Sequence, residues 1–388
     1  MRISQLDWDD ILGWQIQRDT FGADDVSIVL YFGERAALIS RAAAELRAIY
    51  PQAAILGCST GGQITGRGIV EHGVTAVALS FRATRHRLAH RQIADQQGTP
   101  SEASRALGKS IGEELQADDL AGIFVLSDGL RVNGSALVAG LVDAVGGRVP
   151  VSGGLAGDGA NFGLTLVGAN GAPTEGCVGA IGFYGAALRF ATGTGGGWEA
   201  FGPRRRVTFS DGSTLLALDG HPALELYERY LGDEAAALPS SGLLFPLKVW
   251  DPKEPRSAVV RTLLGVERGD NSLIFAGDMP LGWCAQLMRG TIDGLCDGAH
   301  DAAQRASDNL GVGLCDETLA LMVSCIGRRL LMGQRTMDEI EAADEALPKS
   351  AVRIGFFSYG EIAPDSVSRV CKLHNQTMTV TLLAESAG

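Results

Sequence analysis

The prediction of the fold starts from the segment Gly57-Cys58-Ser59-Thr60-Gly61-Gly62-Gln63-Ile64, which closes the second apolar run of the chain. A related segment recurs near the end as Gly355-Phe356-Phe357-Ser358-Tyr359-Gly360-Glu361-Ile362, and a third lies midway as Val151-Ser152-Gly153-Gly154-Leu155-Ala156-Gly157-Asp158-Gly159. Glycine has no Cβ atom, so the backbone of such turns can approach a ligand closely. The repetition predicts a unit of strand, glycine turn and strand that is used several times, with its turns lining a pocket.

The residues after the first and last turns also correspond. Glu71-His72-Gly73-Val74-Thr75 leads into a strand-like run, and Leu373-His374-Asn375-Gln376-Thr377 leads into another. In order, the two copies share glycine, glycine, isoleucine, histidine and threonine. A pocket built mainly from main chain is more typical of ligand binding than of side-chain catalysis, so we expect a binding protein.

Strands and helices alternate along the chain. Residues 26–32 and 53–58 are apolar runs typical of buried strands, and residues 34–50 between them have helical spacing. The pattern restarts with a strand at 121–126 and a helix at 135–145. Such alternation, with added hairpins, predicts an α/β fold of α+β character in which mixed sheets are packed by helices. We expect two related lobes built from repeated β-α-β-turn-β units.

The boundary between these lobes is best placed at residues 201–206, which contain Pro203 and three consecutive arginines. It divides the chain into lobes of residues 1–205 and 206–388. In the second lobe, residues 281–309 are expected to form a long helical stretch, intact or broken near residues 290–298.

Composition and charge exclude several classes of protein. Of the 388 residues, 46% are hydrophobic and 20% are charged, which allows a large buried core. The net charge of −12 disfavours a nucleic acid or an anionic membrane as partner, because both need a basic surface. No apolar stretch is long enough for a membrane span, so no membrane insertion is expected.

The seven cysteines are widely spaced, odd in number and without a CxxC pair. Neither a zinc ribbon nor a disulfide framework is therefore expected. Scattered free thiols are typical of a reducing compartment. Because residues 1–14 also lack the apolar core of a signal peptide, the sequence predicts a cytoplasmic protein.

Several motifs, in order along the chain, give it a resemblance to a known family. In the first half they are Gly57–Ile64, Ser127-Asp128-Gly129 with Asn133-Gly134, and Val151–Asp158 followed by Phe162–Val167. In the second half they are Asp219–Tyr227, Ser324–Arg328, Phe357–Glu361 and His374–Thr377. Together they make the chain resemble the FIST family, named for F-box and intracellular signal transduction proteins, with its adjoining halves FIST-N and FIST-C.

The resemblance implies a sensory, ligand-binding module for small molecules such as amino acids. Some members of the family look like haem-binding nitric-oxide sensors that regulate partner histidine kinases. Many members are fused to a signalling output domain, for which this chain has no room. We therefore expect its signal to pass to a separate partner protein.

The glycine turns supply the first candidate ligand-binding residues. Their backbone N–H groups could line a site for an anion or a polar ligand, or they could simply form tight turns in a repeated fold. Asp158 could hold a ligand ammonium group or cap its own turn. The candidates from these turns are Cys58, Ser59, Thr60, Gly61, Gly153, Gly154 and Asp158.

The loop from Asp128 to Asn133 lies between a predicted strand and a predicted helix. Open α/β sheets bind ligands at such carboxyl ends of strands. Arg131 could bind a carboxylate through two hydrogen bonds. The alternative is a solvent-facing Arg131 beside an Asn133 that caps the helix.

Haem iron would need an axial ligand, often a neutral imidazole in an apolar pocket. His374 is the first candidate because it begins a predicted strand within a motif of the family. His221, which precedes a proline at a helix start, is the second. The alternative for each is an ordinary structural or surface histidine.

The remaining candidates belong to the second half of the chain. Cys325 could be a nucleophile or an iron ligand, because the nearby Arg328 would favour the thiolate; a buried, inert cysteine is the alternative. Tyr359 and Glu361 lie on the last glycine turn, where an acid role is conceivable. Asn375, beside His374, completes the predicted ligand-binding set. An enzyme that uses Cys325, Glu361 or Asp158 is thus a further hypothesis.

Overall fold

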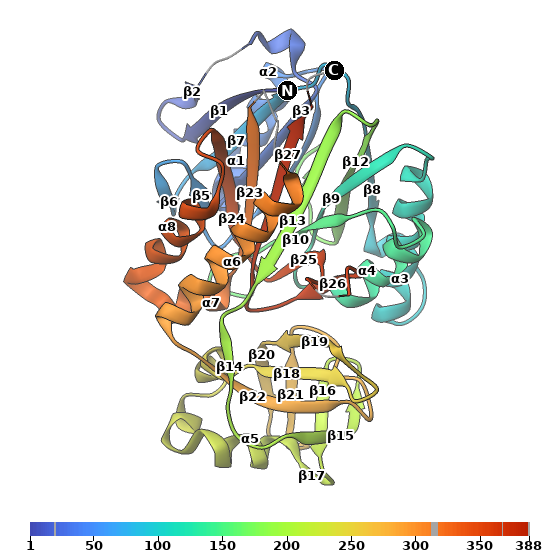
Figure 1. Cartoon of the computed structure of the whole chain (residues 1–388), viewed down its shortest axis with the longest axis vertical. Coiled ribbons are helices and arrows are strands. Elements are labelled where there is room, and N and C mark those ends of the chain that lie inside the picture. The colour runs from blue at the N-terminus through green and yellow to red at the C-terminus, as the bar shows by residue number, and fades with distance from the viewer. Residues whose placement is uncertain (19–20, 312–316, 367, 387–388) are drawn as a thin grey trace.

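The structure is a computed structural model that describes residues 1–18, 21–311, 317–366 and 368–386 (Figure 1). A larger body carries the first and last strands, and a smaller lobe lies below it in the view of Figure 1. Residues 198–290 form the lobe, and the other described residues form the body. None of the helices in these described ranges is long and apolar enough to cross a membrane.

Each of the three six-stranded sheets in the body follows one plan. Two neighbouring parallel strands are joined by a helical connection, and another strand runs antiparallel to the first of them. The mixed α/β fold built from repeated β-α-β-turn-β units is therefore confirmed.

The first sheet is formed mainly by the start of the chain. Its spatial order is β11 (Val167–Ala169), β4 (Ala54–Ser59), β3 (Ile28–Gly33), β7 (Val74–Ser80), β1 (Arg2–Asp9) and β2 (Gly13–Arg18). The parallel pair β3 and β4 is joined by two short helices, α1 (Arg35–Ser40) and α2 (Ala42–Ile49). The single helix expected over residues 34–50 is interrupted at Arg41, whose φ of −146° is not helical.

The second sheet combines the middle of the chain with two strands from its end. Its spatial order is β26 (Cys371–His374), β25 (Gly360–Pro364), β10 (Val151–Leu155), β9 (Leu120–Ser127), β12 (Cys177–Tyr184) and β8 (Arg85–Gln92). Helix α4 (Gly134–Ala144) connects the parallel pair β9 and β10. Helix α3 (Pro100–Leu115) packs beside α4 on the same flank (Figure 1).

The third sheet combines the end of the chain with two strands from its first part. Its spatial order is β13 (Leu188–Gly195), β27 (Met378–Glu385), β23 (Thr318–Cys325), β24 (Ala351–Ser358), β5 (Gln63–Thr65) and β6 (Gly68–Val70). Helices α7 (Ile326–Met332) and α8 (Thr336–Ala346) connect the parallel pair β23 and β24. Helix α6 (Ile292–Leu310) packs against β13 and α8.

The strand that follows each glycine turn leaves the sheet of its own unit. Strand β5 follows β4 but pairs with β24, β25 follows β24 but pairs with β10, and β11 follows β10 but pairs with β4. Each unit thus contributes one strand to a neighbouring sheet, and the exchange closes into a ring of three. The glycine turns are the crossing points, which brings them together inside the body.

The core of the body joins segments that are far apart in the sequence. Strands β23 and β27 are buried along their whole length, which explains their nearly continuous apolar and small residues. Phe32 of the first unit stacks on Phe356 of the third, with ring centroids 4.7 Å apart. Both halves of the chain contribute strands to the same sheets and side chains to the same core. The division into two lobes after residue 205 stays a prediction.

The lobe has a core of its own. Its nine-stranded sheet has the path β19 (Glu254–Arg261), β18 (Leu247–Asp251), β22 (Cys284–Gly290), β15 (Arg205–Asp211), β16 (Thr214–Leu218), β21 (Ser272–Phe275) and β20 (Leu263–Glu267), with β14 (Trp198–Ala200) beside β22 and β17 (His221–Pro222) beside β16. Helix α5 (Ala223–Leu231) adds its apolar face to this core. The expected helix over residues 281–309 begins only at Ile292, because residues 284–290 form β22, whose inner part alternates buried and half-buried positions.

Candidate functional site

Three backbone bends meet where the body exchanges its strands. We name them bend one (residues 59–62), bend two (residues 155–159) and bend three (residues 357–360). Gly61 N–H donates to Phe357 O at 2.9 Å, and Phe357 N–H donates to Gly62 O at 2.9 Å. Bends one and three are therefore joined by reciprocal main-chain hydrogen bonds.

Bend two is bonded to both of the others. Gly157 N–H donates to Ser59 O at 2.9 Å, and Tyr359 N–H donates to Leu155 O at 3.2 Å. The carbonyl of Phe357 and the N–H of Gly61 are 3.3 and 3.2 Å from the position that a Cβ on Gly157 would occupy. These contacts bring together turns that the sequence places about 100 and 200 residues apart.

Two predicted glycines serve the sheet rather than a bend. Gly153 and Gly154 lie within β10, between β9 and β25. A Cβ on Gly153 would be 1.8 Å from Val125 O, and one on Gly154 would be 2.7 Å from a Val323 methyl carbon. Their lack of a side chain therefore allows close packing between strands.

The polar residues of bend one are also occupied within the fold. Ser59 Oγ accepts from Leu166 N–H at 2.9 Å, and Thr60 Oγ1 accepts from Gly62 N–H at 3.2 Å. The neighbouring Cys58 is fully buried, and burial raises the pKa of its thiol well above the usual value. Of the predicted residues 58–61, Thr60 and Gly61 line the bend hollow described below, and Cys58 and Ser59 do not.

Asp158 fixes the loop that follows bend two. Its Oδ2 accepts from Gly163 N–H at 2.9 Å and from Leu164 N–H at 3.0 Å, while its Oδ1 accepts from the Tyr359 hydroxyl. Asp158 thus caps its own turn, which is one of the two alternatives drawn from the sequence. Burial, followed by the bond to Asp158, raises the pKa of Tyr359 above its ordinary value, so this hydroxyl stays a donor.

A first cavity, the bend hollow, lies beside bends one and two. Its volume is about 430 Å³, and its lining comprises Glu34, Arg35, Ala36, Thr60, Gly61, Gly62, Glu71, His72, Asp158, Gly159, Asn161 and Arg329. Much of its charge is paired across its own rim: Arg329 contacts Glu71 at 2.5 Å, and His72 Nδ1 lies 3.2 Å from Glu34. The hollow therefore offers a polar surface on which most charged groups already have partners.

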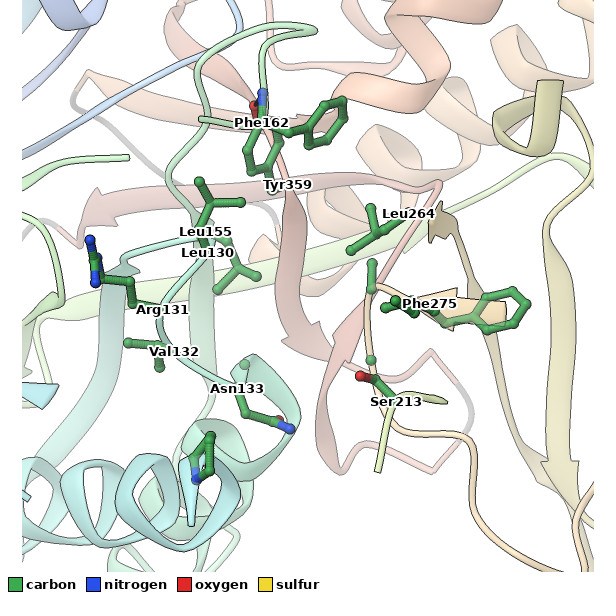
Figure 2. A pocket seen from close by; sticks show the side chains of 16 residues that line it. Leu130, Arg131, Val132, Asn133, Leu155, Phe162, Ser213, Leu264, Phe275 and Tyr359 are labelled. Atoms are coloured by element: carbon green, nitrogen blue, oxygen red, sulfur yellow. Dashed lines mark hydrogen bonds between the residues drawn. The ribbon is translucent and has the colours of Figure 1, made fainter. Parts of the chain in front are cut away.

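A second cavity, the interlobe cleft, lies between the body and the lobe and measures about 320 Å³ (Figure 2). Its body wall comprises Pro100, residues 129–134, Leu155, Phe162 and Tyr359. Its lobe wall comprises Ser213, Leu264 and residues 274–277. Bends two and three thus contribute to the body wall, and hairpins of the lobe close the opposite side.

Apolar side chains from both walls are exposed in this cleft. Leu130 is 41% and Phe162 is 37% exposed on the body wall, and Leu264 is 43% and Ile274 is 38% exposed on the lobe wall. Large apolar side chains that converge on a concave surface are typical of a ligand site. The cleft therefore has the composition expected for binding a molecule with an apolar part.

Two polar links cross beside the cleft. Asn133 caps α4 by accepting from Ala136 N–H at 2.9 Å, and its amide donates to Asp278 of the lobe at 3.1 Å. Arg261 of the lobe is buried and donates to Leu373 O of the body at 3.0 Å. Burial lowers the pKa of Arg261 to about 10, so the group stays charged at neutral pH.

Arg131 occupies the rim of the cleft without closing it. Its guanidinium pairs with Glu175 at 2.8 Å, and that hydrogen bond raises the pKa of Arg131. Figure 2 shows its side chain directed away from the space between the two walls, whereas the amide of Asn133 points toward the lobe. The solvent-facing alternative drawn from the sequence therefore describes Arg131 better than a carboxylate clamp.

The two candidate histidines differ in burial. His374 is 6% exposed, and its Nε2 lies 3.1 Å from Ala363 O, to which it donates. Burial lowers its pKa to about 4, so the imidazole is neutral. His221 is exposed on β17 at the edge of the lobe sheet.

His374 borders a third cavity of about 250 Å³, lined by Thr194, Gly195, Gly196, Gly197, Trp198, Lys248, Ala258, Val259, Val260, Met288, Arg305, Asp365, Ser366, His374 and Thr377. Pockets for drug-sized ligands measure about 300–1,000 Å³ and are mostly apolar. This cavity is smaller than that and carries glycines, hydroxyls and charges. The residues around His374 do not fit a haem group.

The predicted residues of the second half are deeply buried. Burial raises the pKa of Cys325 far above its usual value, so it is a thiol rather than a thiolate. Arg328 is fully buried and pairs with Glu339 at 2.8 Å, which makes it a structural link between α7 and α8. Asn375 is 1% exposed, and its amide atoms have no hydrogen-bond partner among the described residues.

Glu361 is fully buried beside bend three. Ser358 Oγ donates to its Oε1 at 2.6 Å, and Thr377 N–H and Oγ1 donate to its Oε2 at 3.1 and 2.8 Å. Burial raises its pKa to about 8 despite these bonds. Neither Glu361 nor Cys325 borders a cavity described above, so the geometry gives no support to an enzyme that uses them.

Sequence reasoning missed the lobe wall of the cleft. Leu264 and Ile274 lie in strands with ordinary apolar residues, and only the three-dimensional arrangement shows that they face the body. Phe162 was part of a family motif, but its sequence gave no sign of a role in a wall. Arg261 and Asp278 also gave no local signal, because their partners belong to the other part of the molecule.

Comparison with known proteins identifies domains that cover most of the chain. The FIST N domain matches residues 27–221, and the FIST C domain matches residues 223–364. No match was found among curated proteins. Among solved structures, the crystal structure of cyanuric acid hydrolase from A. caulinodans aligns with 95% of this chain and 92% of that chain, at 9% identity and a TM-score of 0.38, and this likeness carries no conclusion.

Proposed function

Because the chain belongs to the FIST family, whose domains are sensory domains that bind small ligands, we propose that it is a sensory protein that binds its ligand in the interlobe cleft. One observation carries this proposal: four large apolar side chains from two different parts of the molecule are left exposed on facing walls of one cavity. Packing them against each other would bury them, whereas the cleft keeps them available for a ligand.

The ligand that suits this cleft has an apolar body and a small polar head. Leu130, Phe162, Leu264 and Ile274 offer apolar contact, while Ser213 on the lobe wall carries a hydroxyl group. Arg131, the charged residue of the wall, is already paired with Glu175. An amino acid with a large apolar side chain has this chemistry.

The signal would arise from the packing of the lobe on the body. A ligand that touches both walls favours the arrangement in which they are close, provided that it binds the two arrangements with unequal affinity. The links from Asn133 to Asp278 and from Arg261 to Leu373 O connect that packing to the walls of the cleft. A separate signalling protein, such as a histidine kinase, would recognise the ligand-bound arrangement.

We place this function in the cytoplasm. The six cysteines in the described ranges are all free thiols. Buried free thiols such as Cys58 and Cys371 persist in a reducing compartment. Secretion of the chain in an oxidised form would contradict this placement.

The experiment is thermal unfolding of the full chain with each of the twenty amino acids in turn. A ligand at about 100 times its dissociation constant adds about 2.7 kcal/mol to the free energy of unfolding. Leu264→Trp should fill the cleft and abolish this stabilisation. The matched control is Leu330→Trp, which changes a side chain of similar exposure (41%) on α7, outside the cleft.

Two results would contradict the proposal. Stabilisation that survives in the Leu264→Trp variant would place the ligand elsewhere, and the bend hollow would then be the next site to test. Equal loss in the two tryptophan variants would show that the effect comes from the fold and not from the cleft.

The haem alternative has a test of its own. Because the cavity at His374 does not fit haem, protein supplied with haem should show no Soret band that shifts with nitric oxide. A Soret band that is present in the wild type and absent in His374→Ala would contradict this reading. The same band in His374→Ala would exclude His374 as the ligand.

A further inference from the structure

We propose that the ligand of the interlobe cleft carries a planar aromatic group, which stacks on Phe162. This inference rests on the proposed function and gives its ligand a chemical class. It starts from the backbone of Phe162, which has a φ of +49°. Residues other than glycine, asparagine and aspartate rarely adopt this left-handed conformation, and it is a marked outlier for a bulky side chain.

Three contacts hold Phe162 in this conformation. Its N–H donates to the Tyr359 hydroxyl oxygen at 3.2 Å, and its ring stacks on that of Tyr359 with centroids 4.6 Å apart and planes 17° apart. Asp158 binds the N–H groups of the next two residues, Gly163 and Leu164. The surroundings therefore fix a backbone conformation that the residue itself disfavours. Such conformations cluster at ligand clamps and active sites.

The ring held in this way is not used to fill the core. Phe162 is 37% exposed, and it is one of the residues that line the interlobe cleft. In Figure 2, Phe162 and Tyr359 lie along one side of the space, with Leu130 and Leu264 on either side below them. The strained backbone of Phe162 therefore places an aromatic side chain at the wall of a cavity.

An aromatic surface favours another aromatic ring over an aliphatic chain of similar size. Offset stacking and edge-to-face contacts add to the area that the two rings bury. Leu264 and Ile274 on the lobe wall would cover the other side of a planar group. A flat ligand could therefore contact both walls of the cleft at once.

The experiment compares two aromatic and two aliphatic probes on the full chain. L-Tryptophan and L-phenylalanine should bind more tightly than L-leucine and L-methionine in calorimetric titration. Phe162→Leu should weaken binding of the aromatic probes roughly 2- to 10-fold and leave that of the aliphatic probes within error. The matched control is Phe209→Leu, which changes an exposed phenylalanine of β15 outside the cleft.

A second variant separates binding from folding. Glycine adopts a positive φ readily, so relief of the strained backbone in Phe162→Gly should offset part of the packing lost with the ring, and the variant should stay folded while losing the preference for aromatic probes. Circular dichroism checks that it is folded, and a folded variant that keeps the preference would overturn the inference.

Three further outcomes overturn the inference without affecting the proposed function, the first two of which concern the aromatic preference itself. One is equal affinity for aromatic and aliphatic probes in the wild type, and the other is an aromatic preference that persists in Phe162→Leu. If no aromatic probe binds while an aliphatic one does, the cleft remains the site and the aromatic class is wrong.

Discussion

At the scale of single residues, Asp158 shows how a candidate ligand contact can be a structural group. Both of its carboxylate oxygens are used by Tyr359, Gly163 and Leu164. Asp158 still borders the bend hollow, so its role decides whether its carboxylate is available to a ligand there.

We predict that Asp158→Ala destabilises the protein by about 1–3 kcal/mol, because it leaves the N–H groups of Gly163 and Leu164 without their acceptor. The change is measured as the free energy of unfolding in urea. Asp301→Ala, which removes an exposed ion pair with Arg305, is the control and should change it by less than about 1 kcal/mol. An Asp158→Ala variant of unchanged stability would contradict a capping role.

Glu361 is a buried residue whose charge state depends on the fold. Its folded pKa is raised to about 8 from the ordinary 4.5, chiefly by burial, so between these pH values the folded state holds a proton that the unfolded state releases. Stability from this group is therefore present below pH 4.5 and falls as the pH rises toward about 8.

We predict that Glu361→Gln removes this part of the pH dependence. The unfolding free energy of the wild type should decline, relative to that of the variant, by on the order of a few kcal/mol across this range. Urea unfolding of both proteins at several pH values gives the difference. Parallel curves for the two proteins would show that Glu361 titrates normally.

The chemistry of single positions was only partly predictable. Asn133 was recognised as a possible helix cap because the N-cap preference is local, but its bond to Asp278 crosses the molecule. For Cys325 the sequence left open a thiolate favoured by Arg328 and a buried, inert thiol; the guanidinium is bound to Glu339 and burial raises the pKa of Cys325, which agrees with the inert thiol. Burial and pairing of this kind depend on contacts that no local spacing encodes.

At the scale of elements, the pair α3 and α4 shows why so many glycines occur outside the bends. A Cβ on Gly108 of α3 would be 2.1 Å from Leu137 O, and one on Gly140 of α4 would be 2.1 Å from Arg105 O. The two helices therefore approach each other with backbone against backbone. Pro100 of α3 and Asn133 at the start of α4 both line the interlobe cleft, so this packing positions part of its wall.

We predict that Gly108→Ala destabilises the protein by about 1–3 kcal/mol, since the added methyl group forces the helices apart. Calorimetry or urea unfolding measures the loss. Lys109→Ala, the neighbouring exposed position, is the control and should stay within about 0.5 kcal/mol of the wild type. A Gly108→Ala variant as stable as this control would contradict the close packing.

The alternation of elements was predictable where hydrophobic period and length agreed, as for α4, which was expected over residues 135–145 and begins after the cap at Asn133. It failed at residues 284–290, where a short run next to a true helix was assigned to that helix. The exchange of β5, β11 and β25 between sheets was also beyond sequence reasoning, because three-residue and five-residue strands give weak periodic signals.

At the scale of the whole molecule, a sensory role for the interlobe cleft requires that the lobe and the body respond to a ligand together. The amide of Asn133 is a direct link between them at 3.1 Å from Asp278. Its oxygen separately caps α4, so the two roles can be separated by mutation.

We predict that Asn133→Ser keeps α4 capped but loosens the lobe, because serine caps helices well and is too short to reach Asp278. Loss of one such hydrogen bond costs about 0.5–1.5 kcal/mol. Hydrogen exchange should therefore speed up in residues 272–278 and stay unchanged in α4. Thr99→Ser is the control, because serine also caps α3 and the described hydrogen bonds of Thr99 to Glu102 stay within the capping box of that helix. Faster exchange throughout α4 would instead indicate a lost cap.

The most direct measurement is hydrogen exchange of the full chain with and without the amino acid that stabilises it most. Ligand binding in the interlobe cleft should give protection on both of its walls, in residues 129–134 of the body and 272–277 of the lobe, and this protection should be lost in Leu264→Trp. Protection confined to the bend hollow, or to the surroundings of His374, would contradict it.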